Sequence, residues 1–302
     1  MVNIDNLKRR AQIVSTIRRF FDEQGFTEVT TAVRIAAPAP EPHIDCPVCN
    51  GRVGSPELPD GSGVFYLRAS PELQMKKLLA LGMDRIYQIG PCFREGEFGK
   101  RHNPEFTMIE WYRRNANYLD IANDLKALLT RLFAVGNEES GMRNDGSSFT
   151  FLTVRDAYLK YAGWDPWQDW NQDRFDFDMA TKIEPNLPKD PVFLIDYPPQ
   201  ASSLAMVTDR SSTYRVAERW EFYWQGMELA NCFTELCDED EQRARFAVAK
   251  AERQELGESD YPIDEEFLSL LPEIGSASGV ALGVDRLVAL LCGAKDIHEV
   301  MA

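Results

Sequence analysis

The sequence predicts an α+β fold, in which an antiparallel sheet is flanked by helices. Several segments have the composition and alternation of antiparallel strands, and helical segments surround them along the chain. Hydrophobic residues make up 44% of the 302 residues, which is ample for a core. No stretch of clear low complexity divides the chain, and segment 137–148 fits an exposed loop better than a linker. We therefore expect a single domain over residues 1–302.

The chain begins with an amphipathic helix, which Gly25 ends, and residues 36–62 are expected to be irregular because they are rich in proline and glycine. A second helix is expected to open at Ser70, Pro71 and Glu72, with serine as the N-cap, proline at the first helical position and an acid in the first turn. The apolar residues of the first helix fall near one stripe: Leu7, Ile13, Val14, Ile17, Phe20 and Phe21.

Further along the chain, two strands should flank a polar loop that begins after Phe93, and a helix follows them. A buried strand is expected at 192–195, and segments 216–224 and 227–236 form a hairpin through Gln225 and Gly226. Segment 238–255 is a charged helix, and 279–290 passes from a strand into a helix. The helix after the polar loop carries its apolar residues at helical spacing: Leu119, Ala122, Leu125, Leu128, Leu129 and Phe133.

The net charge of −15 bears on the class of partner. A protein that grips nucleic acid usually presents a basic face to the backbone phosphates, so no stable nucleic-acid binding is expected. A local basic patch within the acidic total is the alternative. The chain has no secretory hydrophobic segment and no apolar run long enough to span a bilayer, so a cytoplasmic location without membrane contact is expected.

Six cysteines are scattered through the chain, and reduced thiols are the better interpretation. Cys46 and Cys49 have the spacing of a zinc knuckle, but a closed zinc site needs four ligands and His43 is the only nearby imidazole. A structural loop is therefore favoured over a metal site. The three histidines have no triad-like context, which argues against a serine or cysteine hydrolase.

The most informative stretch is 93–113, FREGEFGKRHNPEFTMIEWYR. The run after its polar loop alternates like a strand and places four residues on one face: Phe106, Met108, Glu110 and Tyr112. Arg94 offers a planar fork for phosphate or carboxylate oxygens, and Phe106 offers a flat apolar surface for a purine. The stretch is typical of a site for a nucleoside triphosphate with a carboxylate beside it. A surface hairpin with scattered charges is the alternative.

This stretch resembles motif 2 of the class II aminoacyl-tRNA synthetases, in the lysine branch. GVALGVDRLVAL at 279–290 resembles motif 3 of the same class, and ASPELQMKKLL at 69–79 and GMELANCFTEL at 226–236 are similar to the lysine-pocket segments of that branch. The resemblance covers nearly the whole chain in the family's order. It is greatest to the elongation factor P–(R)-β-lysine ligases, a truncated family that keeps the catalytic domain of lysyl-tRNA synthetase without its anticodon-binding domain.

The resemblance implies the catalytic-domain fold of class II synthetases and an AMP-forming ligase activity. ATP would activate (R)-β-lysine, or lysine, as the adenylate, and a lysine side chain of elongation factor P would receive it. ATP and Mg²⁺ are the implied cofactors. A free-standing lysyl-tRNA synthetase-like enzyme that charges tRNA is the alternative.

The resemblance also implies the nucleotide site. Arg94 and Arg286 would be catalytic: Arg94 bridges the substrate carboxylate and the α-phosphate, and Arg286 covers the face of adenine opposite Phe106. Arg101 and His102 would meet the outer phosphates. The full implied ATP-binding set is Arg94, Glu95, Gly96, Glu97, Arg101, His102, Asn103, Phe106, Glu228, Leu229, Gly283 and Arg286.

For the amino-acid substrate, the implied set is Ser70, Glu72, Tyr112, Asn231, Glu235 and Ala281. A diammonium substrate needs at least two separate acids, because an uncompensated buried charge is costly. Glu221 and Glu228 would hold Mg²⁺ between the ATP phosphates. Asn231 and Glu235 share a strand face whereas Glu228 has the opposite parity, so their common use requires a bulge or bend.

Three positions depart from the lysyl-tRNA synthetase pattern. Gly96 replaces a glutamate at the adenine amino group, which leaves Glu95, Glu97 or a backbone carbonyl for that contact. Ala281 replaces a glycine, as it does in the truncated ligases, and its methyl alters the pocket. Ala32 replaces a proline of motif 1, the usual dimer element; a homodimer is still expected.

Overall fold

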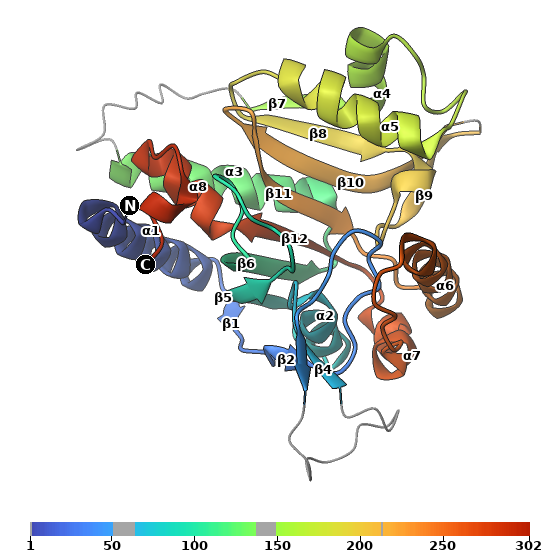
Figure 1. Cartoon of the computed structure of the whole chain (residues 1–302), viewed down its shortest axis with the longest axis horizontal. Coiled ribbons are helices and arrows are strands. Elements are labelled where there is room, and N and C mark those ends of the chain that lie inside the picture. Colours follow the sequence, from blue (N-terminus) through green and yellow to red (C-terminus); the bar gives the residue numbers. More distant parts are fainter. Residues whose placement is uncertain (1, 51–63, 137–148, 213) are drawn as a thin grey trace. The chain divides into compact units, whose positions relative to one another are not determined.

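The computed structural model describes residues 2–50, 64–136, 149–212 and 214–302 (Figure 1). Helices and mostly antiparallel strands make up the described chain, so the predicted α+β class is confirmed. Contacts group the chain into two compact units. The first unit comprises residues 1–114, 237–275 and 283–302, and the second comprises 115–236 and 276–282. The single domain over 1–302 stays a prediction, and the loop expected at 137–148 lies outside the described residues.

The first unit is built around one long hairpin. Strands β5 (Arg85–Phe93) and β6 (Glu105–Arg114) pair antiparallel along their whole length, and the polar loop of the predicted nucleotide site joins them. Strand β1 (Thr27–Glu28) pairs parallel with β5. A small separate sheet has the order β2 (Arg34–Ile35), β4 (Val64–Leu67), β3 (Val48–Asn50), so a strand interrupts the stretch expected to be irregular.

Helix α1 (Ile4–Glu23) opens the first unit, with the Asn3 side chain accepting from the amides of its first turn. Of the predicted stripe it buries Ile13, Ile17, Phe20 and Phe21, whereas Leu7 and Val14 are half-buried, and Thr16 is buried beside them. Helix α2 (Glu72–Ala80) begins one residue later than predicted, since Pro71 and not Ser70 is the N-cap. The Ser70 hydroxyl nevertheless accepts from the Glu72 amide at 2.9 Å. The remaining helices are α6 (Glu239–Leu256), α7 (Glu265–Ile274), α8 (Val284–Cys292) and the 3₁₀ turn η5 (Ile297–Glu299).

The second unit contains a sheet of order β12 (Ala277–Gly283), β11 (Met227–Thr234), β10 (Tyr214–Trp224), β8 (Val192–Tyr197), β7 (Thr150–Thr153), and β9 (Val207–Ser211) pairs with β10. Only the β7–β8 pair is parallel among the pairs within this unit. The predicted hairpin is confirmed: Gln225 and Gly226 have φ of 53° and 71° and form its two-residue turn. Both values lie in the left-handed region that such turns require.

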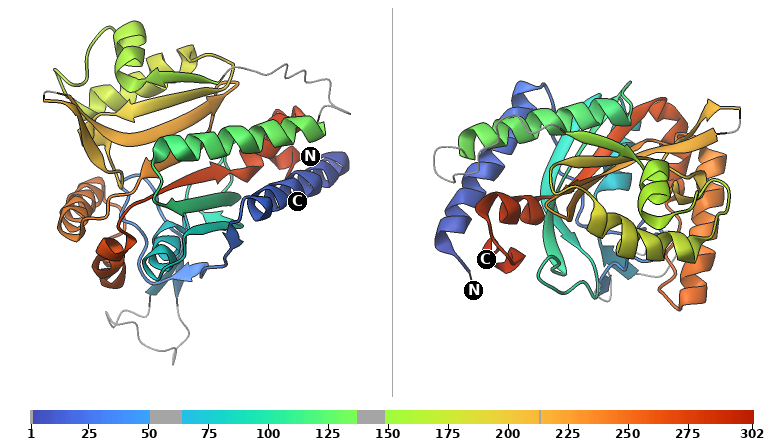
Figure 2. Two further views of the ribbon diagram at one scale, coloured as in Figure 1. Left: turned by 180° about the vertical axis from the view of Figure 1, so that it is seen from behind. Right: turned by 90° about the horizontal axis from the view of Figure 1, so that it is seen from above.

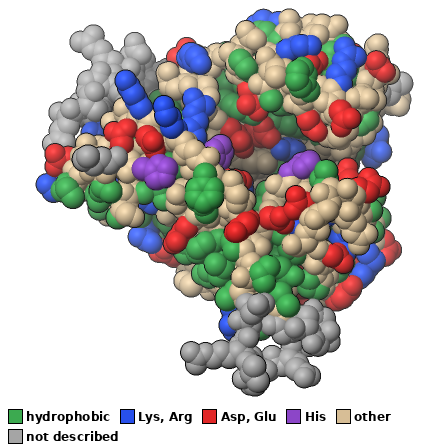
Figure 3. Space-filling model, in the orientation of Figure 1, with side chains coloured by type: hydrophobic (Ala, Val, Ile, Leu, Met, Phe, Trp, Pro, Cys, Tyr) green, Lys and Arg blue, Asp and Glu red, His purple; other side chains and the backbone are tan. Residues whose placement is uncertain are grey.

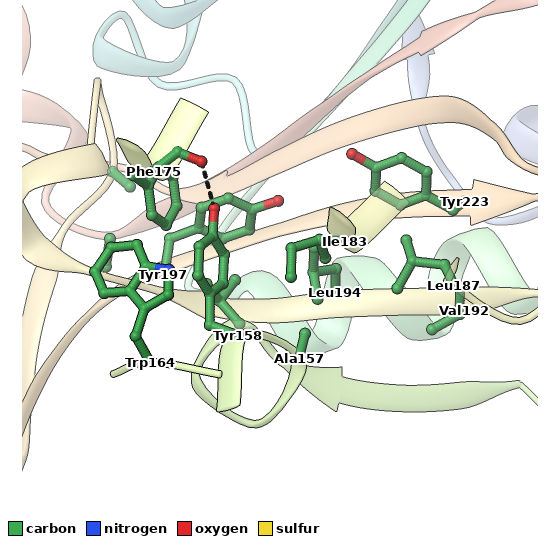
Figure 4. Close-up of a cluster of buried hydrophobic side chains, with 13 residues drawn as sticks. Ala157, Tyr158, Trp164, Phe175, Ile183, Leu187, Val192, Leu194, Tyr197 and Tyr223 are labelled. Atoms are coloured by element: carbon green, nitrogen blue, oxygen red, sulfur yellow. Dashed lines mark hydrogen bonds between the residues drawn. The ribbon is translucent and has the colours of Figure 1, made fainter. Parts of the chain in front are cut away.

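Helix α3 (Tyr118–Gly136) packs along β10 and β11, as both views of Figure 2 show. Against β8, short helical pieces close a hydrophobic core, in which the Tyr158 hydroxyl donates to the Phe175 carbonyl at 2.6 Å and the two rings stack (Figure 4). These pieces are α4 (Val154–Ala157), η1 (Tyr158–Ala162), α5 (Gln172–Asp178), η2 (Met179–Ile183), η3 (Glu184–Asn186) and η4 (Pro199–Ala201). The core fixes β8 and thereby the strands beside it.

Within the described ranges, every helix is too short or too polar to cross a lipid bilayer. Acidic side chains are spread over much of the molecular face in Figure 3, in keeping with the net charge of −15.

Candidate functional site

The predicted site residues fall on both units. The first unit carries Ser70, Glu72, Arg94, Glu95, Gly96, Glu97, Arg101, His102, Asn103, Phe106, Tyr112, Gly283 and Arg286. The second unit carries Glu221, Glu228, Leu229, Asn231, Glu235 and Ala281.

Arg94 is the first residue of the loop that joins β5 to β6. Its amide donates to the Pro104 carbonyl at 2.9 Å, and its guanidinium lies 5.2 Å from the centre of the Phe106 ring. Glu97 is its ion-pair partner, at a long 3.5 Å. The Arg94 Nε is buried and has no hydrogen-bond partner among the described residues. A buried donor without an acceptor is costly, so this arginine is suited to receive an anionic ligand.

Arg286, the third residue of α8, reaches the same hairpin loop. Its Nε donates to the Arg101 carbonyl at 3.2 Å, and its Nη2 lies 2.6 Å from His102 Nε2. Burial, and next the Arg286 charge, lower the pKa of His102. Because a guanidinium has no acceptor, His102 Nε2 must accept this bond, which places the imidazole proton on Nδ1. The structure thus brings together Arg286, Arg101 and His102, and the roles predicted for them stay predictions.

The loop itself explains the glycine at position 96. Gly96 has a φ of +74°, a conformation that side chains rarely adopt, so the chain turns where lysyl-tRNA synthetases would place a glutamate. The Glu95 amide donates to the Asp45 carbonyl at 2.8 Å, and the Asn103 side chain donates to the Glu105 carbonyl at 2.6 Å. Both contacts hold the loop in place. At Gly283 an added Cβ would meet only the Arg286 side chain at ordinary contact distance, so its predicted close approach to nucleotide stays a prediction.

Ser70, Glu72 and Tyr112 converge on a residue that the sequence reasoning did not select, Glu110. The Ser70 hydroxyl donates to Glu110 Oε1 at 2.6 Å, and the Tyr112 hydroxyl donates to Oε2 at 2.8 Å. Glu110 is fully buried, and burial, with the nearby Glu72 charge second, raises its pKa to about 7. We call Ser70, Glu72, Lys76, Glu110 and Tyr112 the Glu110 cluster. Its signal in the sequence was an acid between the buried apolar residues of a central strand.

Lys76 is the cation of the Glu110 cluster. Its Nζ lies 2.5 Å from Glu72 Oε1, one helical turn away on α2, and the lysine side chain is 1% exposed. A buried ammonium is tolerated only with a compensating partner, so the ion pair holds Glu72 in a defined position.

In the second unit a β-bulge brings the predicted residues onto one face. Glu221 pairs with Asn231, whereas Tyr223 pairs with Glu228, so Leu229 is an extra residue on β11. Directly paired residues project to the same side of a sheet, so Glu221, Glu228 and Asn231 share a face. Ala281 pairs with Asn231 from β12 and lies on that face too. The bulge required by the sequence parity is therefore present.

Arg219 contacts the polar residues on this face, and the sequence analysis did not select it. It donates from Nη2 to Glu221 Oε1 at 2.5 Å and from Nε to Asn231 Oδ1 at 3.3 Å. Its Nη1 donates to the Ala201 carbonyl at 3.1 Å, and its guanidinium lies 4.4 Å from the centre of the Tyr197 ring. Each of its three nitrogens thus donates a hydrogen bond to a protein group.

The donor set on this face fits a magnesium ion. Glu221 and Glu228 are diagonal neighbours across two strands, and Mg²⁺ is commonly held by one or two carboxylates together with phosphate oxygens and water. In the described state Glu221 accepts from Arg219 and, at 2.6 Å, from the Tyr223 hydroxyl. The carboxylate is therefore ordered before a cation binds.

Glu235 follows the last residue of β11 and is 3% exposed. Its amide donates to the Ala277 carbonyl at 2.9 Å, which continues the β11–β12 pairing. Leu229 is also buried, at 3% exposure. The roles predicted for these two residues stay predictions.

Cys49 lies in β3 and Cys46 lies just before it, and their assignment to a structural loop stays a prediction. Cys46 is buried, and burial raises the pKa of its thiol to about 11, which disfavours the thiolate that binds metal. Among the described residues no cluster of three histidine, cysteine, aspartate or glutamate side chains could hold a metal ion.

Comparison with known proteins adds full-length similarity to this geometry. A family model described as tRNA synthetases class II (D, K and N) matches residues 2–302. The elongation factor P–(R)-β-lysine ligase of Pasteurella multocida is 37% identical over 322 residues, covering 99% of this chain and 95% of the relative. The protein of the same name from Proteus mirabilis is 37% identical over 324 residues, with the same coverage, and that from Edwardsiella ictaluri is 36% identical over 323 residues, covering 99% and 94%.

Proposed function

The chain belongs to the class II tRNA synthetases of the D, K and N group, and from this premise we propose that it activates (R)-β-lysine, or lysine, with ATP and transfers it to a lysine side chain of elongation factor P. ATP use belongs to the family. Elongation factor P is proposed as the acceptor because the chain matches an elongation factor P–(R)-β-lysine ligase over 99% of its own length and 95% of the relative.

The first step is attack of the substrate carboxylate on the α-phosphorus of ATP, with pyrophosphate leaving and an acyl-adenylate forming. Such a step depends on positioning and charge neutralisation more than on a general base. Arg94 has the position and the buried, unsatisfied Nε for holding the carboxylate and the α-phosphate together. Arg101 and His102 would bind the outer phosphates, and a neutral His102 would do so by donating a hydrogen bond.

Phe106 and Arg286 would hold the two faces of adenine. Arg94 now lies over the Phe106 ring, and Arg286 is bonded to His102. Phe106 would stack on one face of the purine, and Arg286 would cover the other face by cation–π contact. The adenine amino group would meet a backbone carbonyl or the Glu95 or Glu97 carboxylate of the loop, since Gly96 has no side chain.

A diamine acid needs separate anionic groups for its ammonium groups. Glu72 and Glu110 supply two carboxylates in the Glu110 cluster, and Tyr112 and Ser70 orient Glu110. Glu235 would be a further acid and Asn231 would meet the substrate carboxylate. A buried ammonium group is costly unless an acid compensates its charge. The acids of this site therefore support a cationic substrate.

Glu221 and Glu228 would hold Mg²⁺, which would neutralise charge on the ATP phosphates. Arg219 orders Glu221 and also competes with a metal ion for its carboxylate. A homodimer is part of the proposal, and sedimentation analysis of the purified protein would test it.

In the second step the neutral amine of the acceptor lysine attacks the acyl carbon, the bond to AMP breaks, and an amide forms. The attacking amine loses a proton as the amide forms. A deprotonated amine is a strong nucleophile, so the protein need supply little beyond orientation.

The proposal is tested by ATP–pyrophosphate exchange with (R)-β-lysine and α-lysine, followed by intact-mass analysis of elongation factor P. Exchange stimulated by a lysine isomer and a mass gain of one lysyl group on elongation factor P are expected. Efficient charging of tRNA with no modification of elongation factor P would instead establish the tRNA-charging alternative.

A further inference from the structure

Three side chains of the first unit form a closed network behind the proposed nucleotide site. Asp285 of α8 accepts from Arg10 Nη1 of α1 through Oδ1 and from the Thr107 amide of β6 at 2.6 Å through Oδ2. Arg10 Nη2 donates to Thr107 Oγ1 at 2.8 Å. A longer contact, at 3.5 Å, joins Arg10 Nη1 to the Val300 carbonyl. We call Arg10, Thr107 and Asp285 the Arg10 clamp.

The Arg10 clamp is partly buried and leaves no carboxylate oxygen of Asp285 unused. The Asp285 side chain is 4% exposed and that of Arg10 is 20% exposed, so solvent screens their interaction weakly. Both Asp285 oxygens and both terminal nitrogens of Arg10 are engaged. The planar guanidinium thus bridges the Asp285 carboxylate and the Thr107 hydroxyl and fixes the direction as well as the distance between them, which a lysine at position 10 could not reproduce.

The position of the clamp in the sequence gives it a consequence for nucleotide binding. Thr107 directly follows Phe106, and Asp285 directly precedes Arg286. Helix α8 packs on β6 and on α1 in the first unit (Figures 1 and 2). The hydrogen bond from the Thr107 amide to Asp285 therefore connects two segments of the proposed adenine site. One is the strand that bears Phe106, and the other is the helix that bears Arg286.

We propose that Arg10 is a positioning residue for ATP, which acts through Asp285 and Thr107 to hold Arg286 at a fixed spacing from Phe106. This inference rests on the proposed function, since Phe106 and Arg286 are assigned to adenine there. Arg10 touches no reacting atom. A purine ring tolerates little error in the separation of two groups that cover its faces, so loss of the clamp weakens nucleotide binding more than amino-acid binding.

A purely structural role is the competing interpretation. Asp285 lies in the first turn of α8, where an acid favours the helix N-terminus, and its pairing with Arg10 anchors α1. A structural ion pair affects the free energy of unfolding and leaves the two ligand affinities in their original ratio. The experiment must therefore compare ATP with the amino acid in the same variant.

The test uses Arg10→Gln and the control Arg18→Gln. Arg18 lies on the same helix and pairs with Glu28, with Nε at 3.0 Å and 3.3 Å from the two carboxylate oxygens. Binding of ATP with Mg²⁺ and binding of lysine are measured separately by calorimetry, and the melting temperature is recorded for each protein. In Arg10→Gln we expect the dissociation constant of ATP to rise roughly tenfold while that of lysine stays unchanged. In Arg18→Gln both should stay unchanged.

A second variant keeps the inference testable if Arg10→Gln does not fold. Thr107→Val removes the Oγ1 acceptor and leaves the Arg10–Asp285 ion pair, and the same selective loss of ATP affinity is expected at about threefold. Unchanged ATP affinity in a folded clamp variant, or equal losses for ATP and lysine, would overturn the positioning role while leaving the proposed function in place. If the wild-type protein fails to bind ATP, both are wrong.

Discussion

We expect the affinity of the protein for lysine to depend on pH near neutrality, because the buried Glu110 titrates there. Its pKa is raised to about 7, so a large part of the population carries a proton on this carboxyl at neutral pH. An ammonium group bound at the Glu110 cluster favours the ionised carboxylate and lowers this pKa. Binding of the diamine is therefore coupled to release of a proton, and affinity rises with pH until Glu110 is ionised without the ligand.

The size of the effect follows from the fraction of ionised Glu110. With a pKa of about 7, roughly one tenth of the protein is ionised at about pH 6 and roughly nine tenths at about pH 8. We expect the dissociation constant of lysine to fall about tenfold across this window and to change little above it. At about pH 7, binding should release about half a proton. The ammonium groups of lysine are protonated throughout the window.

Stability provides a second readout with a defined sign. The folded pKa of about 7 lies above the ordinary value of 4.5, so between these pH values the folded protein holds more protons than the unfolded chain. The free energy of unfolding from this group is therefore highest below about pH 4.5 and decreases as the pH rises through 7. At 1.36 kcal/mol per pKa unit, the full decrease is about 3 kcal/mol. Glu110→Gln should lack this dependence.

The assay is calorimetric titration of lysine into the protein without ATP, in two buffers of different ionisation enthalpy at each pH. The difference in heat gives the number of protons released. Glu110→Gln should remove both the pH dependence and the proton release, whereas Glu105→Gln, an exposed position on the same strand, should keep both. Proton release that persists in Glu110→Gln, or binding without pH dependence in the wild type, would refute the reasoning.

Three further predictions concern other residues. Arg94→Ala should abolish ATP–pyrophosphate exchange, because it removes the group assigned to both reactants; near-normal exchange would contradict that role. Arg219→Gln releases Glu221 from its ion pair, so binding of Mn²⁺ to the nucleotide-free protein, measured by electron paramagnetic resonance, should tighten several-fold. Arg215→Gln, which removes an exposed ion pair from the same strand, should leave Mn²⁺ binding unchanged. Ala281→Gly should shift the preference between (R)-β-lysine and α-lysine toward α-lysine by about 1–3 kcal/mol, read from the ratio of kcat/KM values, and an unchanged ratio would show that the methyl does not set specificity.

Sequence reasoning predicted the long elements because their signals are local. The stripe of α1, the helix α3 and the two-residue turn at Gln225 and Gly226 depend on neighbours in the chain, and each is confirmed. Within α3 the prediction was wrong for Leu119, which is exposed because it lies in the first turn, away from the buried face. The class II catalytic-domain fold, inferred from the motifs, is confirmed by the family match. Short strands such as β2 and β3 were missed because two or three residues carry no periodicity.

Glu110 and Arg219 were missed for a different reason. Each lies in a strand whose pattern is ordinary, and its importance comes from partners far away in the sequence: Ser70 is 40 residues from Glu110, and Ala201 is 18 residues from Arg219. The start of α2 was one residue off because the Ser70 hydroxyl bonds to Glu72 from outside the helix. The bulge at Leu229 was deduced from parity, but only the strand register locates the extra residue.

Two of the carboxylates proposed to bind a cation already have a cationic partner before any ligand arrives. Lys76 pairs with Glu72 in the first unit, and Arg219 pairs with Glu221 in the second. A ligand cation that approaches either carboxylate therefore competes with a protein cation that stays covalently attached beside it, and repulsion between the two cations offsets part of the attraction. A cation binds tightly at either carboxylate only where further anionic or acceptor groups compensate that repulsion.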